Sequence, residues 1–168
     1  MAKPHPIVNH ADLPWAESSA ERAFRGRRKS LGAAAGARRL GASLYEVPPG
    51  ASAWPRHFHS ANEEAIFVLE GAGTLTLGDA QFPVRAGDFV ALPPGPDHAH
   101  RLANTSRRPL LYLCVSTMVE PEVSFYPDSG KFGVMVGAPP GGDKSRRTFE
   151  GSFRTDAKVA YFDGEPDA

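Results

Sequence analysis

Short runs in which apolar and polar residues alternate dominate the chain from residue 41 onward. The segment Thr74–Leu77 alternates as a half-buried strand does. Glycine and proline turn signals interrupt these runs about every ten residues, a spacing typical of antiparallel β-proteins. The expected strands cover residues 42–47, 54–59, 65–70, 74–77, 89–92, 100–106, 109–117, 123–126, 132–136 and 159–168. The pattern predicts an all-β chain folded as an antiparallel sandwich or barrel.

The 168 residues contain no internal repeat and no second core, so we expect one domain. Residues 41–118 are its predicted barrel core. Residues 1–40, with several prolines and many arginines, are expected to form an extended N-terminal arm or interface segment. Residues 119–168 are expected to add C-terminal strands and a tail to the same domain.

The expected strand 110–115 is apolar on both faces, although an exposed sheet face should be polar. Leu111 and Leu113 lie on one face and Leu110 and Tyr112 on the other. The N-terminal arm or a second subunit must therefore cover the outer face, and we predict a homodimer.

The charge balance argues against two classes of partner. The chain has 19 basic and 19 acidic residues, which argues against nucleic-acid or membrane attraction. The basic segment 22–39 lacks interleaved aromatic residues, which favours a solvated or interface segment over a nucleic-acid patch. With no secretory signal and no long apolar run, a cytoplasmic protein is expected.

Candidate metal ligands lie between residues 50 and 71. His57 and His59 are two residues apart, so a strand would present both imidazoles on one face. Glu63 and Glu64 follow after a short polar turn. Two imidazoles and a carboxylate are typical ligands of a divalent metal. A second pair with the same spacing, His98 and His100, follows a turn rich in proline.

These two stretches resemble the paired motifs of the cupin superfamily. His57, His59, Glu64 and Gly71 match the first motif, and the gap to Gly71 selects Glu64 over Glu63. The second motif matches at Gly87, Pro93, Gly95 and Asn104. Counting from Gly95 points to His98 as the ligand, whereas counting back from Asn104 points to His100. We favour His100, and His98 and Glu63 remain alternative or outer ligands.

The resemblance implies a double-stranded β-helix, the jelly-roll barrel of cupins. It also implies one divalent metal ion held by His57, His59, Glu64 and His100. Zinc, iron, manganese and nickel all accept such ligands, so the sequence does not choose among them. Further shared segments resemble small single-domain bacterial cupins, some of which carry a sugar-phosphate-isomerase label.

The leading hypothesis is a metal-dependent enzyme that acts on a small polar molecule, in the manner of a sugar-phosphate isomerase. A metal-dependent dioxygenase and a non-catalytic small-molecule-binding or sensing module are the alternatives. An isomerase would need a cationic group for phosphate. Arg56, Arg101, Lys131 and the run from Arg25 to Lys29 are available, but the sequence places none of them, and it identifies no catalytic residue.

Overall fold

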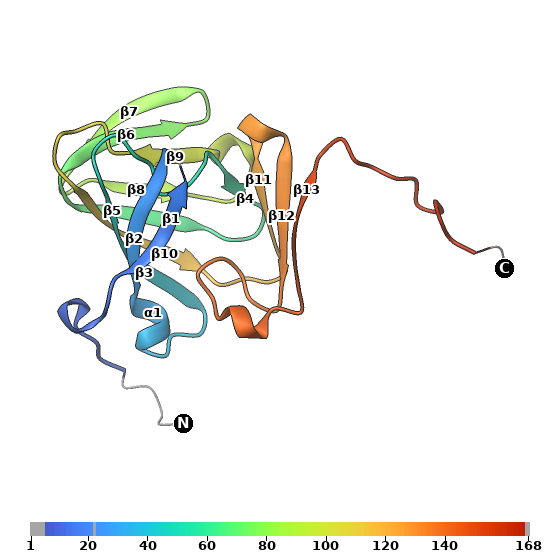
Figure 1. Cartoon of the computed structure of the whole chain (residues 1–168), viewed down its shortest axis with the longest axis horizontal. Helices are drawn as coiled ribbons and strands as arrows, with labels where there is room; N and C mark the ends of the chain where they lie inside the picture. Colours follow the sequence, from blue (N-terminus) through green and yellow to red (C-terminus); the bar gives the residue numbers. More distant parts are fainter. Residues whose placement is uncertain (1–5, 22, 167–168) are drawn as a thin grey trace.

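The structure, a computed structural model, describes residues 6–21 and 23–166, and strands dominate it (Figure 1). The strands are β1 (Ala16–Glu21), β2 (Phe24–Ser30), β3 (Leu40–Val47), β4 (Phe58–His59), β5 (Glu64–Glu70), β6 (Ala72–Leu77), β7 (Ala80–Arg85), β8 (Phe89–Leu92), β9 (His100–Ala103), β10 (Leu110–Thr117), β11 (Glu122–Tyr126), β12 (Lys131–Val136) and β13 (Phe149–Arg154). The helical elements are α1 (Leu31–Ala34) and the 3-10 turns η1 (His10–Asp12), η2 (Pro96–His98), η3 (Pro127–Ser129) and η4 (Lys144–Arg146). None of these helices has the length and apolar character needed to cross a membrane.

The strands form three antiparallel sheets that wrap around one interior. The largest sheet has the order β1-β2-β3-β10-β5-β8, the second β13-β12-β11-β4, and the third β7-β6-β9. Strands far apart in the sequence, such as β3 and β10, are thus direct neighbours in space. This topology confirms the predicted all-β jelly roll.

The N-terminal segment is part of the largest sheet. Residues Arg27–Ser30 of β2 pair with β3, and β1 pairs with the outer side of β2. Trp15 lies against the cationic ends of Arg27 and Lys29, each 4.7 Å from its ring centre. The arginine-rich segment therefore extends the barrel wall, and its alternate residues face opposite sides of the sheet.

The core lies where the inner faces of the sheets meet. Val47, Val68 and Leu110 are fully buried there. On β10 the residues alternate as the pleat requires, because Leu110 and Tyr112 are buried while Leu111 and Leu113 are only partly buried. Inward-facing residues of β3, β5 and β10 therefore form the wall against which the functional side chains pack.

Gly71 shows why the first motif ends in glycine. It joins β5 to β6 with φ of +85°, a conformation that side chains other than glycine rarely adopt. A Cβ atom there would lie 2.5 Å from the carbonyl oxygen of Pro109. The tight turn from β5 into β6 therefore requires glycine on two counts.

Two predicted strands are wrong. Of the segment 54–59, only Phe58–His59 forms a strand, and His57 makes an isolated bridge to His100. Pro55 has no backbone N–H to donate to a sheet, which explains the shortening. Of the predicted strand 159–168, residues 159–166 form no strand and residues 167–168 lie outside the described part of the chain. The described chain after β13 extends away from the barrel (Figure 1). The last strand is instead β13, which pairs with β12.

An apolar strip remains exposed on the outer face of the largest sheet. Phe67 on β5 and Phe89 on β8 are direct cross-strand partners and are 37% and 65% exposed. Leu69 on the same face of β5 is 40% exposed. This strip is the face for which the sequence predicted a cover, and in the described parts of the chain no element buries it. The homodimer stays a prediction.

Candidate metal centre

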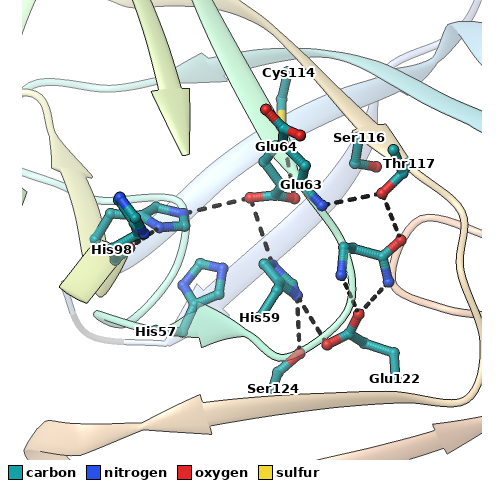
Figure 2. A network of polar contacts seen from close by, with 12 residues as sticks. His57, His59, Glu63, Glu64, His98, Cys114, Ser116, Thr117, Glu122 and Ser124 are labelled. Atoms are coloured by element: carbon teal, nitrogen blue, oxygen red, sulfur yellow. Dashed lines mark hydrogen bonds and ion pairs between the residues drawn. The ribbon is translucent and has the colours of Figure 1, made fainter. Parts of the chain in front are cut away.

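Three of the predicted ligands converge at one point inside the barrel. His57 and His59 come from the short segment that includes β4, and Glu64 begins β5. One ligand atom from each lies within 4.8 Å of the others, a grouping that can hold a metal ion. Figure 2 shows the two imidazoles and the Glu64 carboxylate directed toward one another. Glu63, the neighbouring alternative, is exposed to solvent.

His100 is the fourth predicted ligand, and the barrel brings it to the same point. Its backbone exchanges two hydrogen bonds with His57, at 3.0 and 2.8 Å. Its Nε2 lies 3.4 Å from Oε2 of Glu64. His98, by contrast, belongs to η2 and contacts His100 through its backbone carbonyl. The structure thus brings His100 against Glu64, and among the described contacts His98 makes none with that carboxylate.

Local backbone carbonyls orient two of the imidazoles. The Nδ1 atom of His57 lies 2.8 Å from the carbonyl oxygen of Pro55, and that of His100 lies 2.9 Å from the carbonyl oxygen of His98. A carbonyl oxygen can only accept, so each Nδ1 carries the hydrogen. In the neutral form of each imidazole, Nε2 then offers its lone pair, which is what a metal ligand requires.

His59 provides the test of whether a metal fits. Its side chain is buried, and its Nε2 has no hydrogen-bond partner among the described residues. The nearest charged atom, Oε2 of Glu64, is 3.5 Å away. Buried polar atoms are seldom left without a partner. A cation bound between His59, Glu64 and the other two imidazoles would satisfy this nitrogen, so the donor set fits a divalent ion.

Glu122 supports His59 from behind, and sequence reasoning missed it. This fully buried carboxylate lies on β11, and its Oε1 is 3.6 Å from Nδ1 of His59 (Figure 2). The backbone N–H groups of Ser60 and Asn62 donate to its two oxygens, each at 3.0 Å, and the Asn62 side chain also donates to it. Ser124 Oγ lies 3.3 Å from the same imidazole nitrogen. Carboxylates in this position orient metal-binding histidines and make them more basic.

The cluster is strongly coupled electrostatically. Burial, together with the neighbouring His100, lowers the pKa of His57 to about 4. Burial also opposes protonation of His59, but the Glu122 and Glu64 carboxylates outweigh it and raise its pKa to about 9. Burial would raise the pKa of Glu64, yet its contacts with His100 and His59 hold it well below the usual range. Without metal, His59 therefore carries a proton at neutral pH and His57 does not.

The four residues line a cavity of about 340 Å³ that opens between the sheets. Its wall includes titratable groups other than the predicted ligands, among them Tyr45, Tyr126 and Cys114. Tyr45 is stacked on Tyr112, with ring centres 5.2 Å apart. Cys114 Sγ lies 3.9 Å from Oε1 of Glu64. The cavity wall thus combines aromatic side chains with polar groups near the cluster, as small-molecule sites commonly do.

A salt bridge ties the loop after β11 to the histidine segment. Arg56 binds Asp128 through Nε and a terminal nitrogen, both at 2.8 Å, and donates to the Gly78 carbonyl oxygen at 2.7 Å. The Tyr126 ring stacks on the His57 ring with centres 6.0 Å apart. Arg56 therefore points away from the cluster, and it helps to hold Tyr126 in the cavity wall.

Comparison with known proteins finds a family match for part of the barrel. Residues 43–116 match the family described as "Cupin domain". The crystal structure of a provisionally named sugar phosphate isomerase from Acidithiobacillus ferrooxidans is similar, with a TM-score of 0.76 and 26% identity over 92% of this chain and 96% of that one. A sugar phosphate isomerase of the cupin superfamily from Silicibacter pomeroyi also gives a TM-score of 0.76, with 24% identity over 94% and 98% of the two chains.

Two curated relatives match a shorter segment. An uncharacterized protein of Methanocaldococcus jannaschii is 38% identical over 60 residues, or 36% of this chain and 46% of that protein. The quercetin 2,3-dioxygenase of Bacillus subtilis is 33% identical over 60 residues, or 36% of this chain and 18% of the enzyme. The matched segment thus spans less than half of either relative.

Proposed function

We propose that this protein is a divalent-metal-dependent enzyme that acts on a small polar molecule. Its residues 43–116 match the cupin domain and lie within a jelly-roll barrel. The favoured reaction is the isomerisation of sugar phosphates. The observation that carries the proposal is the buried Nε2 of His59, which lies 3.5 Å from Glu64 and has no hydrogen-bond partner among the described residues. His57, His59, Glu64 and His100 would hold the ion. Their three nitrogen donors and one carboxylate suit zinc, iron, manganese or nickel.

The cavity favours an enzyme over a passive binding module. A bound divalent ion would supply a Lewis acid that polarises a substrate oxygen. An isomerase also needs groups that move protons, and a cavity walled only by apolar residues would lack them. Tyr45, Tyr126 and Cys114 provide titratable atoms within the same cavity. The similarity to the Acidithiobacillus ferrooxidans protein over nearly the full length of both chains supports the sugar-phosphate assignment.

The test is proton exchange catalysed by the metal-loaded protein. The full chain, purified without a metal-binding tag, is loaded separately with zinc, iron, manganese and nickel. It is then incubated in deuterated water with a panel of aldose and ketose phosphates. We expect nuclear magnetic resonance to show deuterium entering at the carbon beside the carbonyl and the isomer accumulating, with neither in His57→Ala. No exchange with any metal-loaded form would contradict the isomerase proposal.

Oxygen chemistry is the second candidate, and one observation favours it. The match to quercetin 2,3-dioxygenase covers 60 residues at 33% identity. Iron in the purified protein, together with oxygen uptake that depends on substrate and is lost in His57→Ala, would select this reaction. Tight ligand binding without turnover would instead select the binding module.

A further inference from the structure

The cavity wall carries more positive than negative groups. Its basic residues are Arg28, Arg101, Lys144 and Arg147, and its acidic residues are Glu17 and Glu64. Glu64 faces the histidines, so it is not available to neutralise the basic groups. Arg147 is held by Glu150 at 2.7 Å and by the carbonyl oxygens of Ala138 and Pro139. Arg147 therefore has its own carboxylate partner, and Arg28 and Arg101 are further basic residues of the wall.

Arg28 reaches the cavity from the N-terminal part of the chain. It lies on β2 directly across from Tyr45 of β3. Tyr45 lies across from Tyr112 of β10, and Tyr112 lies across from Val68 of β5 (Figure 1 shows these strands side by side). Burial raises the pKa of Tyr45, and the neighbouring Arg28 guanidinium opposes that rise. Along β5, Val68 is four residues from Glu64, a spacing of about 13 Å. Arg28 thus lines the cavity from a cross-strand row that is four residues along β5 from Glu64.

Within the described part of the chain, the neighbouring Arg27, unlike Arg28, forms an ion pair with a carboxylate. It sits on the opposite face of β2 and binds Glu46, with Nε and a terminal nitrogen at 2.8 and 2.7 Å from the same carboxylate oxygen. Arg56, Arg147 and Arg154 likewise pair with carboxylates. Arg28 hydrogen-bonds the Tyr45 side chain, but among the described residues no carboxylate pairs with it. A guanidinium without a carboxylate partner in a cavity wall is well suited to bind an anion.

Arg101 provides an independent sign of a missing anion. Its Nε is buried and has no hydrogen-bond partner among the described residues, although Arg101 lines the same cavity. A buried donor without an acceptor is rare and costly. An acceptor entering the cavity would satisfy it.

We propose that Arg28 and Arg101 form an anion-binding subsite in the metal cavity, so that the substrate is a small molecule with a phosphate or carboxylate group. The inference rests on the proposed function, because it takes the histidine cluster to hold the catalytic metal ion. It adds a residue from outside the matched cupin domain as a determinant of specificity. The anionic group would lie at the arginines, and the reacting oxygen would lie toward the histidine cluster.

The experiment measures anion binding by calorimetry on the full chain as purified, with inorganic phosphate, succinate and uncharged glycerol as probes. Arg28→Gln and Arg101→Gln remove the subsite, and Arg27→Gln is the matched control on the opposite face of the same strand. We expect one or both anions to bind the wild type and glycerol not to bind. Loss of one charge-assisted contact should weaken anion binding about tenfold or more in Arg28→Gln and Arg101→Gln. Arg27→Gln should bind as the wild type does.

Metal content, measured on the same samples, separates this inference from the proposed function. Undiminished anion binding in both Arg28→Gln and Arg101→Gln, or no saturable binding of either anion to the wild type, would overturn the subsite even if metal is present. Anion binding that depends on Arg28 in a protein without metal would leave the subsite standing and refute the metal enzyme. If Arg28→Gln does not fold, Arg28→Lys decides, because a retained charge without the fork geometry should bind more weakly than the wild type but measurably.

Discussion

Replacing Glu122 with glutamine should weaken both the metal centre and the fold. The carboxylate is fully buried and accepts backbone N–H groups from Ser60 and Asn62 on separate oxygens. A glutamine offers only one acceptor oxygen, so one of these N–H groups would face an NH₂ group and lose its partner. An unsatisfied buried donor costs about 1–3 kcal/mol, and the bond that remains loses its charge assistance, worth about 1 kcal/mol more.

The expected loss of unfolding free energy is therefore about 2–4 kcal/mol for Glu122→Gln. For a chain of this size, that corresponds to a fall in melting temperature of roughly 4–16 °C. Metal affinity should also fall by about ten- to a hundredfold, because His59 loses the anionic group behind its Nδ1. Circular dichroism melts give the first quantity, and competition with a metal chelator gives the second.

Glu63→Gln is the matched control, because this glutamate next to the cluster is exposed. It should leave both quantities within experimental error of the wild type. If Glu122→Gln lost stability but kept wild-type metal affinity, Glu122 would be only a structural anchor for the Ser60–Asn62 backbone. If it changed neither quantity, the argument from buried hydrogen bonding would be refuted.

Three further predictions follow from the same contacts. His100→Ala should lower bound metal far more than His98→Ala in elemental analysis, and equal losses would contradict the placement of His100 against Glu64. Because the pKa of His59 is raised to about 9 without metal, an ion must displace that proton. Apparent metal affinity should therefore fall as pH falls below about 9, with about one proton released at neutral pH in calorimetry across buffers of different ionisation enthalpy. No proton release would contradict this protonation state. Phe89→Lys, which places a charge in the exposed apolar strip beside Phe67, should shift a wild-type dimer toward monomer in sedimentation experiments, and a wild type that is monomeric at every concentration would contradict the homodimer.

Local patterns predicted much of the fold, because the alternation of apolar and polar residues and the glycine turn signals depend only on residues close together in the sequence. They failed where a neighbour decides the outcome. Val159, Tyr161 and Phe162 resemble a strand in composition, yet they are 76–89% exposed because no sheet edge receives them. The segment 54–57 is predicted to begin the strand that carries the histidines, but Pro55 has no backbone N–H to donate to a sheet.

The candidate ligands could be inferred from spacing because His57 and His59 lie on one short segment and Glu64 follows closely. Glu122 could not, because it reaches His59 only through the pairing of β11 with β4, in which Ser124 lies opposite His59. Arg28 could be named only as one member of the run from Arg25 to Lys29, for a similar reason. Its role depends on the pairing of β2 with β3, and in the sequence it is one of several adjacent basic residues. Signals of this kind arise from long-range pairing, which a single sequence does not encode locally.

The metal content of the purified protein shows whether the four residues form a metal centre. The full chain is purified without a metal-binding tag, and zinc, iron, manganese and nickel are quantified in the wild type and in His59→Ala. We expect about one divalent metal ion per chain in the wild type, because the four ligands form one site. We expect close to none in His59→Ala. The absence of metal from both proteins after reconstitution, or equal metal in both, would contradict the metal centre.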